Sequence, residues 1–556
     1  MRKRVFSLVS LAVLVAVFAG LASSASARVT AESAAGLKDP QRGTLQFQIK
    51  VAKSAVSSPV TGRTFVIISR NNEAEPRFQI DTTGVPFFGM DVSAVRPGAT
   101  LTMARGASVY GYPLTAISKI PAGYYYVQAF FNVYTKFDRS DGSTVWLHMP
   151  GGDGQDPFSS PGNLYSKVIR VRLDPARAKT VKLLLDQVVQ PADPVPVGGT
   201  TQQGNPSDSA HVKHIKIQSD LLTAFWGTPM YIAANVLLPE GYDSSLSSYP
   251  VVYSQGHFPT SNPFGFKEDL SDAFSKWWVA ADTPRMIAVT IRHENPYYDD
   301  SYAVNSANLG PYGDAITQEL IPAIDANFRT FPQRWARTLT GGSTGGWETL
   351  AQMAFYPELY QGAWAFAPDS VDFRFHQLVN VYDDANAYFT QSEWVDVPRP
   401  ASRSIPGDTL LTMEQENHFE LALGTHGRSG WGQWDIWQAV YGPQGPDGYP
   451  APIWDKLTGQ IDKTVAEAWR PMDLRIFFED NWATVGPKVA GRIHVGVGDD
   501  DNYFLNDAVE LLDQSLAART DPSADAEFWY GPNGGHSWRP YTTPELLTIM
   551  YQAMHP

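Results

Sequence analysis

The residues that first suggest chemistry are the run Gly341-Gly342-Ser343-Thr344-Gly345-Gly346, in which a serine has a glycine two positions away on each side. A strand-like stretch, 337–340, precedes the run, and a helix-like stretch, 347–355, follows it. A serine at a sharp strand-to-helix turn has a strained backbone, and the side chains two positions away must be nearly absent. Such a turn exposes the hydroxyl and directs the first helical N–H groups toward its target. The run predicts Ser343 as a nucleophile.

Taken alone, the same run also fits a glycine-rich turn in a loop, because the chain has 45 glycines in 556 residues. Its context favours the nucleophile, since an acid and a base follow in the order Ser, Asp, His. The strand-like stretch 493–498 leads into Asp499-Asp500-Asp501, at the end where parallel sheets place catalytic groups. The stretch 527–530 leads into a loop of small residues that contains His536.

These three residue types have complementary roles. A serine hydroxyl is a poor nucleophile at neutral pH until an imidazole takes its proton. A carboxylate holds that imidazole in one tautomer and stabilises the imidazolium that forms. The spacing predicts His536 as the base, and it leaves Asp499, Asp500 and Asp501 open as the acid.

Beyond this constellation, the chain resembles a known family. Pro239-Glu240-Gly241-Tyr242-Asp243 and the following 249–258 are similar to the opening motif of the putative-esterase family, which includes esterase D, enterochelin esterase, feruloyl esterases and mycolyltransferases. Residues 319–330 resemble a helix of that family, and 337–346 resemble its serine turn. The resemblance covers roughly 230–370 and 490–540.

The resemblance implies an α/β-hydrolase fold and a serine esterase with a Ser343–His536–Asp501 triad. Asp501 is implied because the family's acid stands three positions after the glycine that is here Gly498. The oxyanion that forms when Ser343 attacks the ester carbonyl would accept hydrogen bonds from the backbone N–H groups of Thr344 and Phe258. The family's His-Gly pair is replaced here by Gly256-His257, so a shifted register would make His257 the second donor.

The start of the chain predicts its compartment. Arg2-Lys3-Arg4 is a basic segment, 5–21 is apolar, and Ala25-Ser26-Ala27 is a cleavage site, so residues 1–27 are predicted to be a secretory signal peptide. We therefore expect a secreted or periplasmic protein. No later stretch approaches the ~20 apolar residues of a membrane helix, so no membrane span is expected.

The composition narrows the possible partners. The net charge is −14, which argues against nucleic acid and anionic membranes as partners. The chain has no cysteine, so disulfides and a lipoprotein anchor are excluded. No His-x-x-x-His pair suggests a metal, and we expect no cofactor, although calcium at a surface loop stays open. The expected partner is a small-molecule or polymer-borne ester.

The length predicts more than one domain. Within residues 40–190, apolar and polar residues alternate as in half-buried strands, which predicts a β-sandwich-like domain without catalytic groups. The strand-like stretches are 44–51, 64–69, 124–134, 144–148, 166–173 and 180–185. A proline-rich linker is expected at 191–207. From 208 to 556, strands alternate with helices, which predicts a largely parallel sheet covered on both faces. A strand is expected at 286–291, and a helix around 316–324.

A cap-like insertion is expected at 370–490, between the serine turn and the acid. It contains seven of the 16 tryptophans, and we expect most of them to pack in the cap while one or two line the pocket. Just before and within it, Asp369, Asp372 and Arg374 either approach the site or form a surface ion pair.

Three functions compete at this point. The first is a secreted serine esterase that works through an acyl-enzyme. The second is a serine peptidase of the prolyl-oligopeptidase type, whose usual propeller needs repeats that residues 40–190 lack. The third is a catalytically silent binding protein, which would have no need of all three residues Ser343, Asp501 and His536.

Overall fold

The computed structural model describes residues 44–106, 108–148, 156–190, 206–257, 262–297 and 300–554. The expected signal peptide and residues 191–205 of the expected linker lie outside these residues. From Gly43 onward the chain forms one compact unit. Within the described ranges, no helix is long and apolar enough to cross a membrane.

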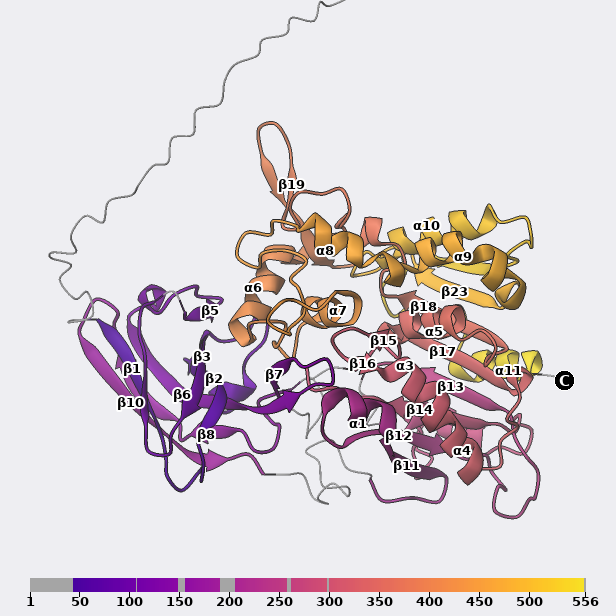
Figure 1. Cartoon of the computed structure of the whole chain (residues 1–556), viewed down its shortest axis with the longest axis horizontal. Helices are drawn as coiled ribbons and strands as arrows, with labels where there is room; N and C mark the ends of the chain where they lie inside the picture. The colour runs from indigo at the N-terminus through magenta and orange to yellow at the C-terminus, as the bar shows by residue number, and fades with distance from the viewer. Residues whose placement is uncertain are drawn as a thin grey trace, which may run out of the picture. The chain divides into compact units, whose positions relative to one another are not determined.

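The second half of the chain is built on a mixed sheet of eight strands in the order β11-β12-β14-β13-β17-β18-β23-β24 (Figure 1). The first two strands pair in antiparallel fashion, and the six from β14 to β24 are parallel. The strands are β11 Val212–Ser219, β12 Met230–Leu237, β13 Val251–Gln255, β14 Ile287–Arg292, β17 Arg337–Ser343, β18 Gly362–Pro368, β23 Ile493–Gly498 and β24 Glu527–Gly531. The predicted α/β organisation with strands at 286–291 and 493–498 is confirmed.

Both faces of this sheet are buried, because its central strands are apolar at consecutive positions. In β13, Val251 and Tyr253 belong to one apolar cluster, whereas Val252 between them belongs to another. Successive side chains of a strand point to opposite faces, so the two clusters lie on the two faces of the sheet. The carboxyl ends of the parallel strands meet at one edge, where the loops that carry polar groups begin.

Helices cover these two faces. α5 packs on β17 and β18, α10 packs on β18 and β23, and α11 packs beside α2. The helices of the chain are α1 Asp220–Trp226, α2 Ala273–Trp278, α3 Tyr312–Ala315, α4 Ile321–Asn327, α5 Thr344–Phe355, α6 Met413–Leu423, α7 Gln433–Tyr441, α8 Lys463–Ala468, α9 Leu474–Val489, α10 Leu505–Ala517 and α11 Thr543–Ala553. A helix around 316–324 is confirmed, with a π-helical turn at Ile316–Leu320 just before Pro322, whose ring nitrogen carries no N–H.

The first part of the chain forms a separate sheet of ten strands in the order β4-β1-β10-β8-β6-β2-β3-β5, with β7 and β9 also paired to β6. The strands are β1 Leu45–Val51, β2 Val60–Ser69, β3 Phe87–Val95, β4 Thr100–Met103, β5 Tyr110–Tyr112, β6 Gly123–Asp138, β7 Thr144–Leu147, β8 Leu164–Ser166, β9 Ile169–Leu173 and β10 Lys179–Val188. β6 pairs with β9 at its start and with β7 at its end. That these strands form a separable sandwich-like domain stays a prediction.

The segment expected as a cap contains α6, α7, α8 and two hairpins: β19 Phe389–Gln391 with β20 Asp396–Pro398, and β21 Pro400–Arg403 with β22 Thr409–Thr412. Its last helix, α9, packs on α5 and α10, so 474–489 belong with the helices that cover the sheet. A short hairpin of β15 Asn305–Ser306 and β16 Gly310–Pro311 lies beside α7.

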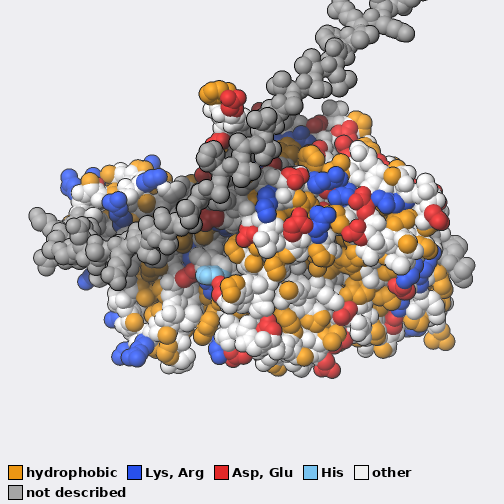
Figure 2. Space-filling model, turned by 45° about the horizontal axis from the view of Figure 1, so that its top comes forward, with side chains coloured by type: hydrophobic (Ala, Val, Ile, Leu, Met, Phe, Trp, Pro, Cys, Tyr) orange, Lys and Arg blue, Asp and Glu red, His pale blue; other side chains and the backbone are white. Residues whose placement is uncertain are grey.

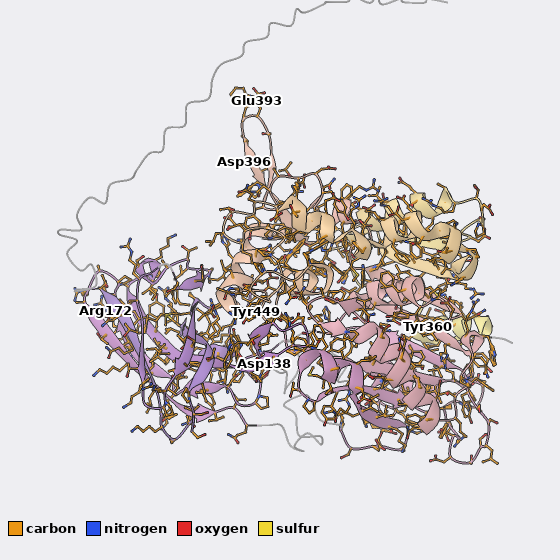
Figure 3. All side chains as sticks on the ribbon, in the orientation of Figure 1. Asp138, Arg172, Tyr360, Glu393, Asp396 and Tyr449 are labelled. Atoms are coloured by element: carbon orange, nitrogen blue, oxygen red, sulfur yellow. The ribbon has the colours of Figure 1, made fainter. Side chains whose placement is uncertain are left out.

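Most tryptophans of this segment are core residues, as expected: Trp434, Trp437, Trp454, Trp469 and Trp482 are buried. Trp394 is 84% exposed. It lies between β19 and β20, in the hairpin that projects from the rest of the fold and carries Glu393 and Asp396 (Figure 3). Elsewhere on the surface, acidic and basic side chains are mixed over the face shown in Figure 2.

α6 is one of the places where the ten-stranded sheet contacts the rest of the fold. Phe419 of α6 packs edge-on against Phe87 and Tyr112, with ring centroids 5.8 and 5.3 Å away. Arg63 of β2 is fully buried, and its guanidinium donates to the backbone carbonyls of Leu421 and Ala422 at the end of α6. The same guanidinium pairs with Asp91 at 3.0 Å. The last carbonyls of a helix have no hydrogen-bond donor within the helix, and Arg63 supplies donors to two of them in α6.

We predict that Arg63→Ala lowers the free energy of unfolding by about 2–4 kcal/mol, because it leaves buried carbonyls without a donor and removes the closer of the two cations that pair with Asp91. Urea denaturation followed by tryptophan fluorescence measures the change. Arg177→Ala is the matched control: Arg177 pairs with Asp174 from a side chain that is 73% exposed, and its loss should cost less than about 0.5 kcal/mol. Equal effects of the two substitutions would contradict this account of the interface.

Candidate active site

Ser343 is the last residue of β17 and stands immediately before α5. Its φ of 58° and ψ of −126° lie in a region that non-glycine residues rarely adopt. The flanking glycines allow this turn. A Cβ at Gly341 would lie 2.2 Å from the carbonyl oxygen of Gly345, and a Cβ at Gly345 would lie 2.2 Å from that of Gln255. Strand, turn and helix therefore approach more closely than any side chain permits.

Asp501 and His536 lie together on the loops that follow β23 and β24. The Asp501 Oδ2 to His536 Nδ1 distance is 2.8 Å. Asp501 is fully buried, and its Oδ1 accepts the backbone N–H groups of Tyr503 and Leu505. The ring of Tyr503 stands edge-on to that of His536, with centroids 4.9 Å apart. This carboxylate is fixed, and it orients the imidazole.

Asp499 and Asp500 are more exposed than Asp501 and lie in the turn before it. Their backbone N–H groups donate to the carbonyls of Gly531 and Gly534, each at 2.9 Å, which ties the β23 loop to the β24 loop. Of the three neighbouring aspartates, the structure brings Asp501 into contact with His536.

A second carboxylate, Asp369, follows β18 and approaches the serine. Ser343 Oγ donates to Asp369 Oδ1 at 3.3 Å. Asp369 Oδ2 accepts from Tyr302 Oη, Thr344 Oγ1, Trp437 Nε1 and Gln433 Nε2, at 2.8, 3.0, 3.2 and 3.3 Å. Burial raises the pKa of Asp369, while the charge of His257 and these donors act against that rise. The sequence had left open whether Asp369 approaches the site or forms an ion pair, and it approaches the site.

The other two residues of that group form the ion pair. Asp372 is buried and pairs with Arg374 at 2.6 Å and with Arg475 of α9 at 2.6 Å. They join the loop after β18 to α9 and do not line the cavity beside Ser343.

The cavity at Ser343 has a volume of about 330 Å³. It is lined by His257, Ser343, Asp369, Gln377, Glu416, Trp431, Gln433, Trp437, Tyr503, Leu505 and His536. Two of its walls are therefore tryptophans of the expected cap, Trp431 and Trp437, in agreement with the sequence-based expectation. Among the described residues that line it, none is Lys or Arg. An anionic ligand would find no fixed cation there other than an imidazolium.

Glu416 of α6 is a residue of this cavity that the sequence analysis did not identify. Burial raises its pKa to about 7, against an opposing hydrogen bond from Trp434 Nε1 to Oε2 at 3.1 Å. No local motif marks Glu416, because its position depends on how α6 packs between the two sheets.

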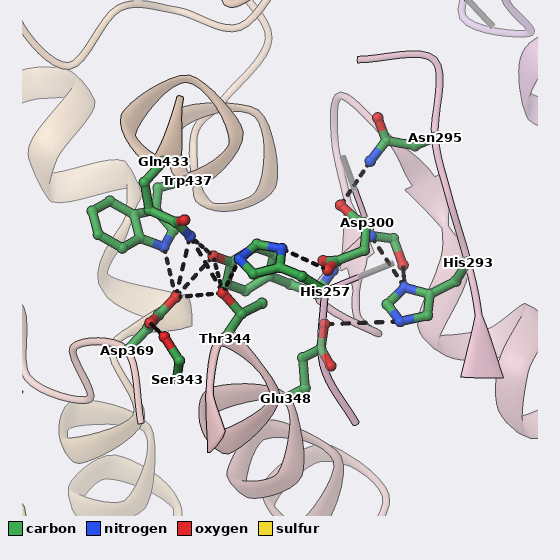
Figure 4. A network of polar contacts seen from close by, with 12 residues as sticks. His257, His293, Asn295, Asp300, Ser343, Thr344, Glu348, Asp369, Gln433 and Trp437 are labelled. Carbon is green, nitrogen blue, oxygen red and sulfur yellow. Dashed lines mark hydrogen bonds and ion pairs between the residues drawn. The ribbon is translucent and has the colours of Figure 1, made fainter. Parts of the chain in front are cut away.

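Of the two expected oxyanion donors, Thr344 is the first residue of α5, where backbone N–H groups are unpaired within the helix. Phe258 lies outside the described residues. His257 lies two residues after the end of β13, and its side chain contacts Asp300 and Thr344 (Figure 4).

Behind α5, three buried side chains lie close enough to hold a metal ion: His293, Asp300 and Glu348. The backbone N–H of Ser301 donates to His293 Nδ1 at 3.1 Å, so that nitrogen carries no proton and Nε2 carries it. The protonated Nε2 faces Glu348 Oε1 at 3.8 Å. In this tautomer Ser301 uses the lone pair of Nδ1, and the nitrogen that faces Glu348 carries a proton and offers no lone pair to a metal ion.

Comparisons with known proteins identify the family of the chain. A family model described as putative esterase matches residues 228–550. An endo-1,4-beta-xylanase/feruloyl esterase of Xylanibacter ruminicola is 30% identical over 168 residues, which are 28% of this chain and 21% of that protein, so the match spans about a fifth of the relative. Two solved structures are similar: a ferulic acid esterase (15% identity, 62% of this chain and 98% of that chain, TM-score 0.37) and an S-formylglutathione hydrolase from Agrobacterium tumefaciens (13%, 63%, 98%, 0.33).

The glycine requirement of the turn can be tested on stability alone. We predict that Gly345→Ala lowers the free energy of unfolding by about 2–4 kcal/mol, since a methyl group cannot fit 2.2 Å from a backbone oxygen. Gly106→Ala, where a Cβ meets nothing within 4 Å, is the control and should change it by less than about 0.5 kcal/mol. Both values come from urea denaturation, and a neutral Gly345→Ala would show that the turn is looser than described.

Proposed function

We propose that this chain, which belongs to the putative esterase family, is a carboxylic-ester hydrolase that cleaves its ester through Ser343, His536 and Asp501. The observation that carries this proposal is the 2.8 Å contact between His536 Nδ1 and Asp501 Oδ2, at the cavity that also contains the strained Ser343. A buried carboxylate on Nδ1 leaves Nε2 as the nitrogen that takes the serine proton.

The reaction proceeds through an acyl-enzyme. His536 Nε2 takes the proton of Ser343 as Oγ bonds to the ester carbonyl carbon, and the carbonyl oxygen becomes an oxyanion. The oxyanion is stabilised by the N–H of Thr344 and an N–H of the loop after β13. The C–O bond to the alcohol then breaks, and His536 gives the alcohol its proton. Water, deprotonated by His536, releases the acid and restores Ser343.

The hydroxyl of Ser343 must turn before it reacts. Its hydrogen bond runs to Asp369 Oδ1, and among the described contacts none joins it to His536. Substrate entry into the cavity displaces this contact and turns Oγ toward His536, a change of one rotamer.

We propose that the substrate is an uncharged or cationic ester, either small or borne on a polymer. The supporting features are the aromatic side chains Trp431, Trp437 and Tyr503, and the two carboxyl groups Asp369 and Glu416. Carboxylates lining a cavity disfavour an anionic acyl group. Residues 1–27 would direct the chain out of the cytoplasm, to a compartment in which a polymer-borne ester is accessible.

Ser343→Ala should abolish hydrolysis of p-nitrophenyl and feruloyl esters and labelling by a fluorophosphonate probe, because it removes the attacking oxygen. Circular dichroism should be unchanged. Labelling of another serine at the wild-type rate in this variant would rule out Ser343. Turnover of peptide amides in place of esters by the wild type would instead indicate the peptidase.

Asp501→Asn should lower kcat by about 10⁴-fold, since an amide favours the wrong tautomer of His536. Asp499→Asn is the matched control, because it changes the same residue type two positions away and leaves the carboxylate of Asp501 on His536. It should stay within about threefold of the wild type. If Asp499→Asn or Asp500→Asn lowers kcat more than Asp501→Asn does, the assignment of the acid is wrong.

A further inference from the structure

The site contains a second histidine paired with a carboxylate, in addition to His536 and Asp501. His257 Nδ1 lies 3.0 Å from Asp300 Oδ2, and His257 Nε2 lies 2.5 Å from Thr344 Oγ1 (Figure 4). Asp300 is 1% exposed, and the side chain of His257 is 29% exposed at the cavity that contains Ser343. The two ring nitrogens thus bridge a buried carboxylate and the residue directly after the nucleophile.

The hydrogen bonds fix where the proton of Thr344 lies. Its hydroxyl has a single proton, and its oxygen lies 3.0 Å from Asp369 Oδ2. That carboxylate oxygen also receives Tyr302 Oη and Trp437 Nε1, so it acts as an acceptor throughout. Thr344 Oγ1 also contacts Tyr302 Oη at 3.1 Å and Gln433 Nε2 at 3.4 Å. With its proton on the 3.0 Å contact to Asp369, Thr344 accepts from His257 Nε2.

A donor at Nε2 toward Thr344, together with a proton on Nδ1, which faces Asp300 Oδ2 at 3.0 Å, would place protons on both ring nitrogens of His257. This is the imidazolium form. The surrounding charges agree with it. Burial raises the pKa of Asp300, but the charge and hydrogen bond of His257, the charge of His293 and the backbone N–H of Tyr302 together hold that pKa below its usual value. Of the influences that oppose burial at Asp369, the charge of His257 is also the largest.

The other titratable groups around His257 are held neutral. Burial and the charge of Asp300 raise the pKa of Glu348 on α5 well above its usual value. Burial lowers the pKa of His293, against the charges of Asp300 and Glu294. Tyr302 faces His257 edge-on at 6.3 Å between ring centroids. Among the described residues around the two buried anions Asp300 and Asp369, His257 is then the one cation that faces both.

This balance has a consequence at the reacting centre. A carboxylate 3.3 Å from Ser343 Oγ opposes the negative charge that forms during attack on an ester. A positive charge on His257, which contacts the Thr344 side chain, offsets the repulsion between Asp369 and the developing negative charge. The backbone N–H of Thr344 is the proposed oxyanion donor.

We propose that His257, fixed by Asp300, is a permanent positive charge beside the oxyanion position that offsets Asp369 and holds Thr344 in place. The inference rests on the proposed function, because it needs Ser343 as the nucleophile. His257 is a positioning residue in this scheme, and it neither attacks the substrate nor exchanges a proton with it.

The test compares kcat, KM and their pH dependence from pH 6 to 8 in His257→Gln and Asp300→Asn. His257→Gln keeps a side-chain N–H donor but no charge, so kcat should fall about 10- to 100-fold while KM changes less than about threefold. Asp300→Asn removes the anion that keeps His257 protonated. Its activity relative to the wild type should therefore fall progressively as the pH rises through this range. The double variant should match His257→Gln alone, because the two residues act as one unit.

Two further pairs separate charge from folding. Thr344→Val removes the acceptor of His257 and should lower kcat, whereas Thr344→Ser keeps it and should restore most of the rate; this pair decides the question if His257→Gln does not fold. His211→Gln is the control, since His211 also bridges carboxylates, Glu240 and Glu268, but lies outside the cavity. Its kcat should stay within about twofold of the wild type.

The outcomes distinguish the inferred role of His257 from the proposed role of Ser343 as nucleophile. The inference is overturned if His257→Gln folds and keeps the wild-type kcat, or if Asp300→Asn loses the same fraction of activity at every pH. The proposed function still stands in that case if fluorophosphonate labels Ser343 of the wild type. A wild-type protein that neither labels at Ser343 nor turns over esters overturns both.

Discussion

The close approach of backbone to backbone at Ser343 is the constraint on which the rest of the site depends. β17 ends, turns and enters α5 within one residue at a positive φ, and the carbonyl of Gln255 at the end of β13 lies against Gly345. Such strain persists only when the surroundings over-determine it. Here the parallel sheet fixes β13, β17 and β18 in register, and α5 is buried along almost its whole length. The turn therefore puts Thr344 between Asp369 and the loop that carries His257.

The site is also an arrangement of buried charge. Two histidines each place Nδ1 on a fully or almost fully buried aspartate, Asp501 for His536 and Asp300 for His257. A buried carboxylate needs several donors or a cation, and each of these has them. Asp369 meets the same need with donors from two parts of the chain: Tyr302 in the loop after β14, and Gln433 and Trp437 in α7. The segment between the serine turn and the acid thus contributes two of these donors, Gln433 and Trp437.

Some of this architecture follows from local sequence and some does not. The strands at 44–51 and 493–498, and the serine turn, have a periodicity or a glycine spacing that is readable within ten residues. β3 has glycine, aspartate and serine within it, and its strand pattern is weaker. No local pattern identified Asp300 or Glu416. The sequence around Asp369 did not decide whether it approaches Ser343. Their positions depend on contacts across many residues, such as the end of α6 against Arg63, which no local pattern encodes.

α6 has one more implication, because it belongs to two environments at once. One side of it lies on the ten-stranded sheet through Phe419 and the bond from Arg63 to its last carbonyls, and Glu416 on the same helix lines the cavity of Ser343. A molecule bound beside Ser343 therefore contacts a helix that is also held by Arg63 of β2 and Phe87 of β3, so the ten-stranded sheet is part of the support behind that wall of the cavity.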